Sequence, residues 1–157
     1  MSPRAPQVPC FGLAAAVVLA DQLSKAWALQ HLGRGPWRGW LPGLLDLELL
    51  YNRGAAFSLF SGAGGLLALI SLLVALGLGL WILGQRQMNL VQIAGTGLLL
   101  GGTIGNGLDR WRLGAVVDFL ALVPVRFPVF NLADMAINLA VICFLFDLLN
   151  RRGSQQP

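Results

Sequence analysis

Two aspartates stand where a chain rarely places a charge, and their type and surroundings suit them best for chemistry. Asp118 interrupts the apolar run of residues 116–120. Asp134 lies about two turns into the last apolar segment, on one helix face with Asn131 and Asn138. Two carboxylates brought together in a poorly solvated place cannot both ionise cheaply, so one keeps its proton and the pair titrates as a unit. One carboxylate can then activate water while the other polarises a carbonyl, which is the chemistry of aspartic peptidases.

Other catalytic arrangements find little support in the sequence. No Ser/His or Cys/His pairing stands out, and a zinc site would lack ligands. The single histidine, His31, lies in a region rich in Trp, Gly and Arg, where we expect an interfacial residue rather than a base. We therefore expect no metal and no cofactor.

Asp21 and Lys25 are four residues apart on one helix face and carry opposite charges within an apolar segment. An ionisable group inside a membrane span costs about 2.5–3.5 kcal/mol on insertion scales, so both are functional candidates. A self-neutralising pair and a group that faces the substrate explain them equally well.

A second polar group ends another apolar segment at Asn106, Asp109 and Arg110. Non-helical backbone at membrane depth needs hydrogen-bond partners from the protein. We expect Asn106 and Arg110 chiefly to hydrogen-bond the carbonyls of a neighbouring loop.

The elements that must position these residues are membrane spans. The chain of 157 residues is 56% hydrophobic and 11% charged, whereas a soluble domain carries about 25% charged residues. At about 20 apolar residues per span, there is room for roughly four spans and no separate soluble domain. We expect an all-α membrane protein of one domain (residues 1–157), with spans at about residues 9–31, 63–83, 90–108 and 129–149.

The first span also resembles a signal peptide, with Arg4 before a short apolar core and Val18-Leu19-Ala20 as a cleavage site. The helical pattern continues past Asp21 without a break, so an uncleaved span fits better. The net charge of +4 comes from scattered residues. This pattern favours contact with a membrane surface over a nucleic-acid partner.

The connection of residues 32–62 predicts a small sheet on the membrane surface. Residues 45–49 alternate with period two and predict a strand. Asn52-Arg53-Gly54 predicts a turn, and residues 55–60 predict a second short strand. Tryptophans in this connection are of the type favoured at the lipid–water boundary.

The second long connection, residues 109–128, holds Asp118 and two prolines that exclude a continuous helix. Pro128 suits the first turn of the last helix. In the span before it, Gly97, Gly101 and Gly105 line one face and should allow a close helix neighbour. Because that face can be used within the bundle, we expect a monomer.

The residues alone leave two alternatives and the orientation open. A small transporter or proton conduit could use Asp118, Asp134 and the Asp21–Lys25 pair as a relay, although no broken span or inverted repeat is visible. A non-catalytic membrane scaffold is possible too, but it leaves the two acids unexplained. Four spans place both termini on one side, and the distribution of basic residues does not decide which side.

Five motifs in a fixed order give a more specific indication than the two aspartates. They are Asp21-Gln22-Leu23-Ser24-Lys25, Asn52-Arg53-Gly54-Ala55-Ala56-Phe57-Ser58, the stretch of residues 101–110, Val117-Asp118-Phe119 and Phe130-Asn131-Leu132-Ala133-Asp134. Together they closely resemble the bacterial lipoprotein signal peptidase family (signal peptidase II) over nearly the whole chain.

This resemblance implies an aspartic endopeptidase of the bacterial inner membrane, with both termini in the cytoplasm and with residues 32–62 and 109–128 outside it. Such an enzyme cleaves diacylglyceryl-modified prolipoproteins just before the lipidated cysteine, so its partners are these precursors and membrane lipid. By motif, Asp118 and Asp134 are the catalytic pair, and the surface sheet cradles the substrate. The positions implied to shape the site or hold the substrate are Asp21, Lys25, Asn52, Gly54, Asn106, Arg110, Asn131 and Ala133.

Overall fold

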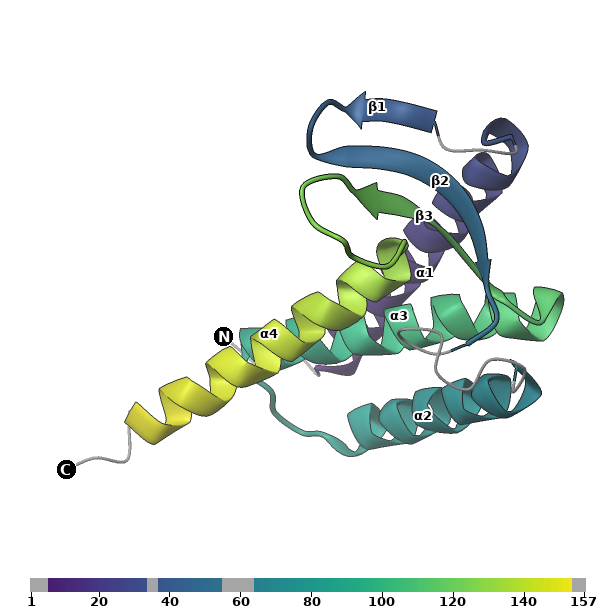
Figure 1. Ribbon diagram of the computed structural model, residues 1–157. Coiled ribbons are helices and arrows are strands. Elements are labelled where there is room, and N and C mark those ends of the chain that lie inside the picture. The colour runs from purple at the N-terminus through teal and green to yellow at the C-terminus, as the bar shows by residue number, and fades with distance from the viewer. Residues whose placement is uncertain (1–5, 34–36, 55–63, 154–157) are drawn as a thin grey trace.

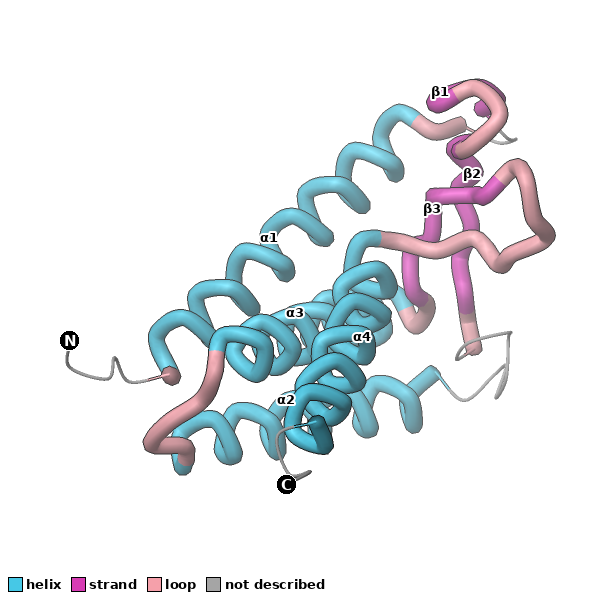
Figure 2. The backbone as a smooth tube through the Cα atoms, turned by 90° about the vertical axis from the view of Figure 1, so that its left-hand side faces the viewer, coloured by secondary structure: helices cyan, strands magenta, loops and turns pink. Residues whose placement is uncertain are grey.

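The computed structural model describes residues 6–33, 37–54 and 64–153, which form four helices and one small sheet. The helices are α1 (Gln7–His31), α2 (Gly64–Gly84), α3 (Leu90–Leu113) and α4 (Leu132–Gly153). The strands are β1 (Trp37–Leu41), β2 (Leu45–Asn52) and β3 (Val116–Leu122). The sheet lies at the end of the helix bundle away from the start of α1 and the end of α4 (Figures 1 and 2).

Helix α3 lies at the centre of the bundle and contacts the other three helices. Its glycines let the neighbouring backbones approach closely. A Cβ atom added at Gly101 would lie 2.8 Å from the carbonyl oxygen of Ala14 in α1, and one added at Gly102 would lie 2.6 Å from that of Ala133 in α4. An added Cβ atom at Gly97, Gly101 or Gly105 would lie within 3.0 Å of an atom of α1, so the predicted close-packing face is confirmed.

Three of the described helices are long and apolar enough to cross a membrane: α1, α2 and the part of α4 from Leu132 to Arg151. Helix α3 is not among them. Most of its buried positions are glycines, which pack against other helices instead of facing lipid. The chain is thus mostly helical, with three clear candidates for membrane spans and a small antiparallel sheet.

The sheet has the strand order β1-β2-β3 with antiparallel pairing throughout. The strand predicted at residues 45–49 is confirmed and continues to Asn52. The second predicted strand, at residues 55–60, lies outside the described residues. Strand β3 was not predicted, and it replaces the irregular connection that we expected around Asp118. Its backbone finds partners in β2, which makes the apolar run of residues 116–122 extended.

A small apolar core fixes the sheet to the end of α1. Leu47 of β2 and Phe119 and Leu120 of β3 pack with Ala28 and Leu32, and all five are buried. Ala28 lies in the final turn of α1, and Leu32 is the residue that follows this helix. The sheet is therefore packed against the end of the helix bundle and is not a free-standing layer.

The start of α4 differs from the prediction. The backbone of Phe130 pairs with Leu120 of β3, in both directions, at 2.9 Å and 3.0 Å. This bridge keeps the chain extended after Pro128, so the helix begins only at Leu132. The prediction that Asp134 lies two turns into the last helix is therefore wrong: it lies in the first turn.

Candidate active site

Asp118 is held by strand β3 with its side chain 1% exposed. Leu50 is its partner in β2, and Asn52 follows two residues later on the same strand. The side-chain amide of Asn52 donates to Asp118 Oδ2 at 3.1 Å. The amide of Asn131, which directly precedes α4, donates to Asp118 Oδ1 at 2.6 Å.

Asp134 is held by the start of α4. Its backbone N–H donates to Asn131 Oδ1 at 2.9 Å, and the backbone N–H of Asn131 donates to Asp134 Oδ2 at 3.2 Å. This reciprocal pair has the geometry of a helix capping box. The side-chain amide of Asn106 in α3 donates to Asp134 Oδ1 at 2.7 Å. Both carboxylate oxygens of Asp134 therefore accept hydrogen bonds, and its charge lies at the favourable end of the α4 dipole.

Asn131 brings the two aspartates together. It donates to the carboxylate of Asp118 and caps the helix turn that carries Asp134. The pKa of Asp118 is raised to about 7, chiefly by burial and also by the nearby charge of Asp134, against the hydrogen bonds from Asn52 and Asn131 that favour the ionised form. Near neutral pH this pair can hold one proton.

A buried cluster of three charges lies behind the aspartates. The ammonium of Lys25 in α1 lies 2.8 Å from Asp21 Oδ2 and 2.9 Å from Asp109 Oδ2. All three side chains are nearly or fully buried. Lys25 also donates to Asn106 Oδ1 at 3.1 Å. Because an ammonium can only donate, Asn106 must turn its oxygen to Lys25 and its NH₂ group to Asp134.

The two carboxylates of this cluster also hold the backbone next to each candidate catalytic residue. Asp21 Oδ1 accepts from the N–H of Ala133, directly before Asp134, at 3.0 Å. Asp109 Oδ2 accepts from the N–H of Val117, directly before Asp118, at 3.0 Å. One ion cluster thus positions both halves of the site.

Of the two explanations left open for Asp21 and Lys25, the structure supports the ion pair. Neither residue lines the cleft described below. The sequence did not indicate how Asp109 acts, because its ion pair with Lys25 joins residues far apart in the chain. The position of Asp109 in the sequence was itself an indication, since this acid stands beside Arg110 at the end of an apolar segment.

A cleft of about 580 Å³ opens in front of the aspartates, between α2, α3 and α4. Both carboxylates line it, together with Asn52, Asn106, Arg110 and Asn138. The apolar part of the lining comes from α2, from the start of β3, from α4 and from the segment before α4, and its residues are Ile70, Val74, Val116, Phe127, Pro128, Val129, Phe130 and Ile137. Sequence reasoning did not anticipate the contribution of α2, which includes Ser71. Thr103 of the motif at residues 101–110 also lines the cleft.

Arg110 holds the turn that closes one side of this cleft. Its guanidinium donates to the carbonyl oxygen of Gly54 at 3.4 Å, and the N–H of Gly54 donates to Asn52 Oδ1 at 3.0 Å. Arg110 therefore binds a loop carbonyl as predicted. Asn106 does not, because its amide is used between Lys25 and Asp134. His31 lies away from the site, exposed and stacked on Trp27.

Comparison with known proteins identifies relatives of this whole arrangement. The family model described as signal peptidase (SPase) II matches residues 13–150. A lipoprotein signal peptidase of Synechococcus sp. is 55% identical over 141 residues, which cover 88% of this chain and 93% of that protein. One of Parasynechococcus marenigrum is 51% identical over 150 residues, covering 96% and 94%.

Two solved structures share the fold. A bacterial membrane enzyme at 2.3 Å superposes with a TM-score of 0.85 and 27% identity, over 94% of this chain and 91% of that one. A second, at 1.9 Å, has a TM-score of 0.79 and 30% identity, over 89% and 92%. The likeness therefore extends to the sheet as well as the helices.

Proposed function

The chain belongs to the signal peptidase II family and removes signal peptides from prolipoproteins, and we propose that Asp118 and Asp134 are the residues that cut the peptide bond. The observation that best supports this proposal is the pair of contacts made by Asn131. Its side chain hydrogen-bonds the carboxylate of Asp118 and caps the helix turn that carries Asp134. Both aspartates line one cleft. The chemistry needs no group from outside the chain except water.

We assign the shared proton at rest to Asp118. Its carboxyl is buried, and its pKa of about 7 favours the protonated form below neutral pH. Asp134 is partly exposed, and its carboxylate accepts from the side-chain amide of Asn106 and from the backbone N–H of Asn131. Asp134 is therefore the general base, and Asp118 is the acid.

In the first step Asp134 takes a proton from water while the water oxygen attacks the carbonyl carbon of the scissile bond. Asp118 gives its proton to the carbonyl oxygen, which forms a neutral tetrahedral diol. In the second step Asp134 returns its proton to the amide nitrogen as the C–N bond breaks. Asp118 recovers its proton from a hydroxyl of the diol, so the carboxylic acid product forms and the pair is reset.

The remaining site residues act on this pair or on its surroundings. Asn106 and Asn131 orient the carboxylates. Lys25 holds Asn106 by a hydrogen bond to its Oδ1 atom. Asp21 accepts from the backbone N–H of Ala133, directly before Asp134. Asn52, Gly54 and Arg110 hold the turn beside the cleft. The apolar lining of the cleft suits the lipid chains and the signal peptide of a diacylglyceryl-modified precursor, cut just before the lipidated cysteine.

We further propose that α3 is a fourth span, within a single membrane domain in the inner membrane. Its position between three apolar helices supports this, because such a helix meets protein instead of lipid. Four spans place both termini on one side, and the family resemblance implies that this side is the cytoplasm, so the sheet lies outside it, where residues 32–62 and 109–128 receive the substrate. The glycine faces of α3 are used within the bundle, which favours a monomer surrounded by membrane lipid.

The direct test of the substrate is a paired incubation of the purified protein with one precursor before and after diacylglyceryl transfer. We expect the lipidated form to be cut just before its cysteine and the unmodified form to stay intact. Equal cleavage of both forms would contradict the requirement for lipid. Mass spectrometry of the products locates the bond.

A further inference from the structure

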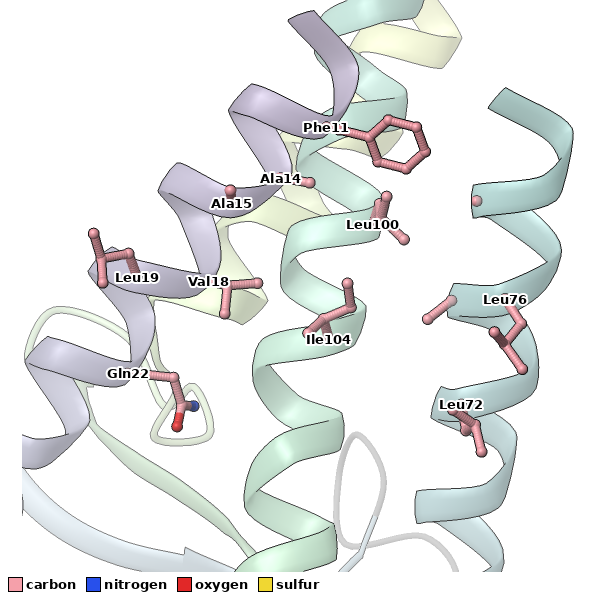
Figure 3. A pocket seen from close by; sticks show the side chains of 12 residues that line it. Phe11, Ala14, Ala15, Val18, Leu19, Gln22, Leu72, Leu76, Leu100 and Ile104 are labelled. Carbon is pink, nitrogen blue, oxygen red and sulfur yellow. The ribbon is translucent and has the colours of Figure 1, made fainter. Parts of the chain in front are cut away.

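An apolar groove runs between α1 and α2, apart from the cleft that holds the aspartates (Figure 3). Its volume is about 660 Å³, within the range of about 300–1,000 Å³ that is usual for small-molecule sites. Phe11, Leu100 and Ile104 point from α1 and α3 toward Leu72 and Leu76 of α2 (Figure 3). The groove and the cleft have no lining residue in common within the part of the chain that the structure describes.

The groove crosses the middle of the bundle, since Gln22 at its polar end bonds the carbonyl of Gly105, eight residues before the end of α3. Along α1 it extends from Phe11 to Gln22, which is about 16 Å at 1.5 Å per residue. The apolar part of one monolayer is about 15 Å thick, half of a hydrocarbon core of about 30 Å. A narrow apolar space of this length fits an extended acyl chain.

The groove ends at a polar group on the side of the sheet. Among the described residues Gln22 is the only polar one in the lining, and the Oε1 atom of Gln22 accepts from the guanidinium of Arg112 at 3.4 Å. Arg112 is exposed and forms no ion pair within the described part of the chain. Its neighbour Trp111 is 62% exposed and is of the residue type that marks the lipid–water boundary. A cation therefore lies beside the polar end of the groove.

We propose that this groove binds one phospholipid from the monolayer on the side of the sheet, with an acyl chain between α1 and α2 and the phosphate on Arg112. A guanidinium binds phosphate oxygens in a fixed, charge-assisted geometry. A second transmembrane helix in the groove would leave this cation without an anion. The site does not depend on the proposed catalytic role of the aspartates.

The test uses the full-length protein in detergent, titrated with phosphatidylglycerol and observed by native mass spectrometry. Gly79 lines the groove, and a Cβ atom there meets no atom within 4 Å, so Gly79→Phe fills the space without displacing a neighbour. We expect the wild type to retain one phosphatidylglycerol and Gly79→Phe to lose it. Gly77→Phe is the matched control, because Gly77 lies on the same helix with equally open surroundings but outside the groove.

The headgroup is tested separately. Arg112→Gln should bind phosphatidylglycerol about 10-fold more weakly, as expected for the loss of a charged hydrogen bond. Arg86→Gln, in the short loop at the other end of the bundle, should bind like the wild type. Diacylglycerol, which lacks the phosphate, should bind the wild type about 10-fold more weakly as well.

Three results would overturn the proposal. One is equal retention of lipid by the Gly79→Phe and Gly77→Phe variants. Thermal unfolding shows whether both variants are folded, and Gly79→Leu replaces Gly79→Phe if the larger side chain prevents folding. Another is equal binding of diacylglycerol and phosphatidylglycerol. The third is a dimer that Gly79→Phe abolishes, which would assign the groove to a second copy of the chain.

Discussion

Replacement of Asn52 by alanine should move the pH dependence of cleavage, and the direction of the movement identifies the aspartate that holds the proton. The amide of Asn52 donates to Asp118 Oδ2 at 3.1 Å and so favours the ionised carboxylate. A hydrogen bond to a charged group contributes about 1.5–3 kcal/mol. At 1.36 kcal/mol per pKa unit, its loss should raise the pKa of Asp118 by about 1–2 units from its value of about 7.

The sign follows from the role of Asp118. If Asp118 is the acid, activity requires its protonated form, and the alkaline limb should shift upward from about pH 7 to about pH 8–9 in Asn52→Ala. If Asp118 were the base, activity would require its ionised form. The acid limb would then shift upward and activity at neutral pH would fall. The measurement is kcat/KM for a lipidated precursor in micelles across this range.

A control separates this effect from damage to the site. Asn52 also accepts from Gly54 at 3.0 Å, so its loss loosens the turn and lowers kcat/KM at every pH without moving a limb. Ser71→Ala is the matched variant, because Ser71 lines the same cleft and its hydroxyl donates to the carbonyl of Leu67 within α2. Its pH profile should match the wild type. An alkaline limb that stays in place or moves down in Asn52→Ala would refute the assignment of the proton to Asp118.

Two further predictions concern stability, both measured by thermal unfolding in detergent. Lys25→Met leaves Asp21 and Asp109 buried without a counter-charge and should destabilise the protein by about 3–5 kcal/mol; wild-type stability would show that the cluster is not ionic. Gly102→Leu places a side chain where even a Cβ atom would lie 2.6 Å from a backbone oxygen of α4, and it should lower the unfolding temperature sharply. Gly77→Leu, which meets open space, should leave it nearly unchanged, and equal effects of the two would contradict close packing of α3 and α4.

Local sequence patterns predicted the helices and one strand because those elements depend on nearby residues. The period-two alternation at residues 45–49 and the glycine spacing of α3 are signals within one segment, and both are confirmed. Asp118 and Asp134 were found in the same way, since a charge in an apolar run is conspicuous by itself.

Contacts between distant segments were not predictable from such patterns. Strand β3 is extended because β2 supplies its hydrogen-bond partners, and its apolar run alone did not reveal this. The start of α4 was predicted too early because the pairing of Phe130 with Leu120 delays the helix. The hydrogen bonds from Val117 to Asp109 and from Ala133 to Asp21 likewise depend on the tertiary structure.

The most direct test of the catalytic pair is the cleavage of one lipidated prolipoprotein by Asp118→Asn and by Asp134→Asn. An amide keeps the size of the side chain but can neither hold the shared proton nor act as the base. Each variant should fold and insert like the wild type, with kcat lower by at least about 100-fold, the smaller end of the range for general acid–base catalysis. Cleavage at the wild-type rate by either folded variant would contradict the account.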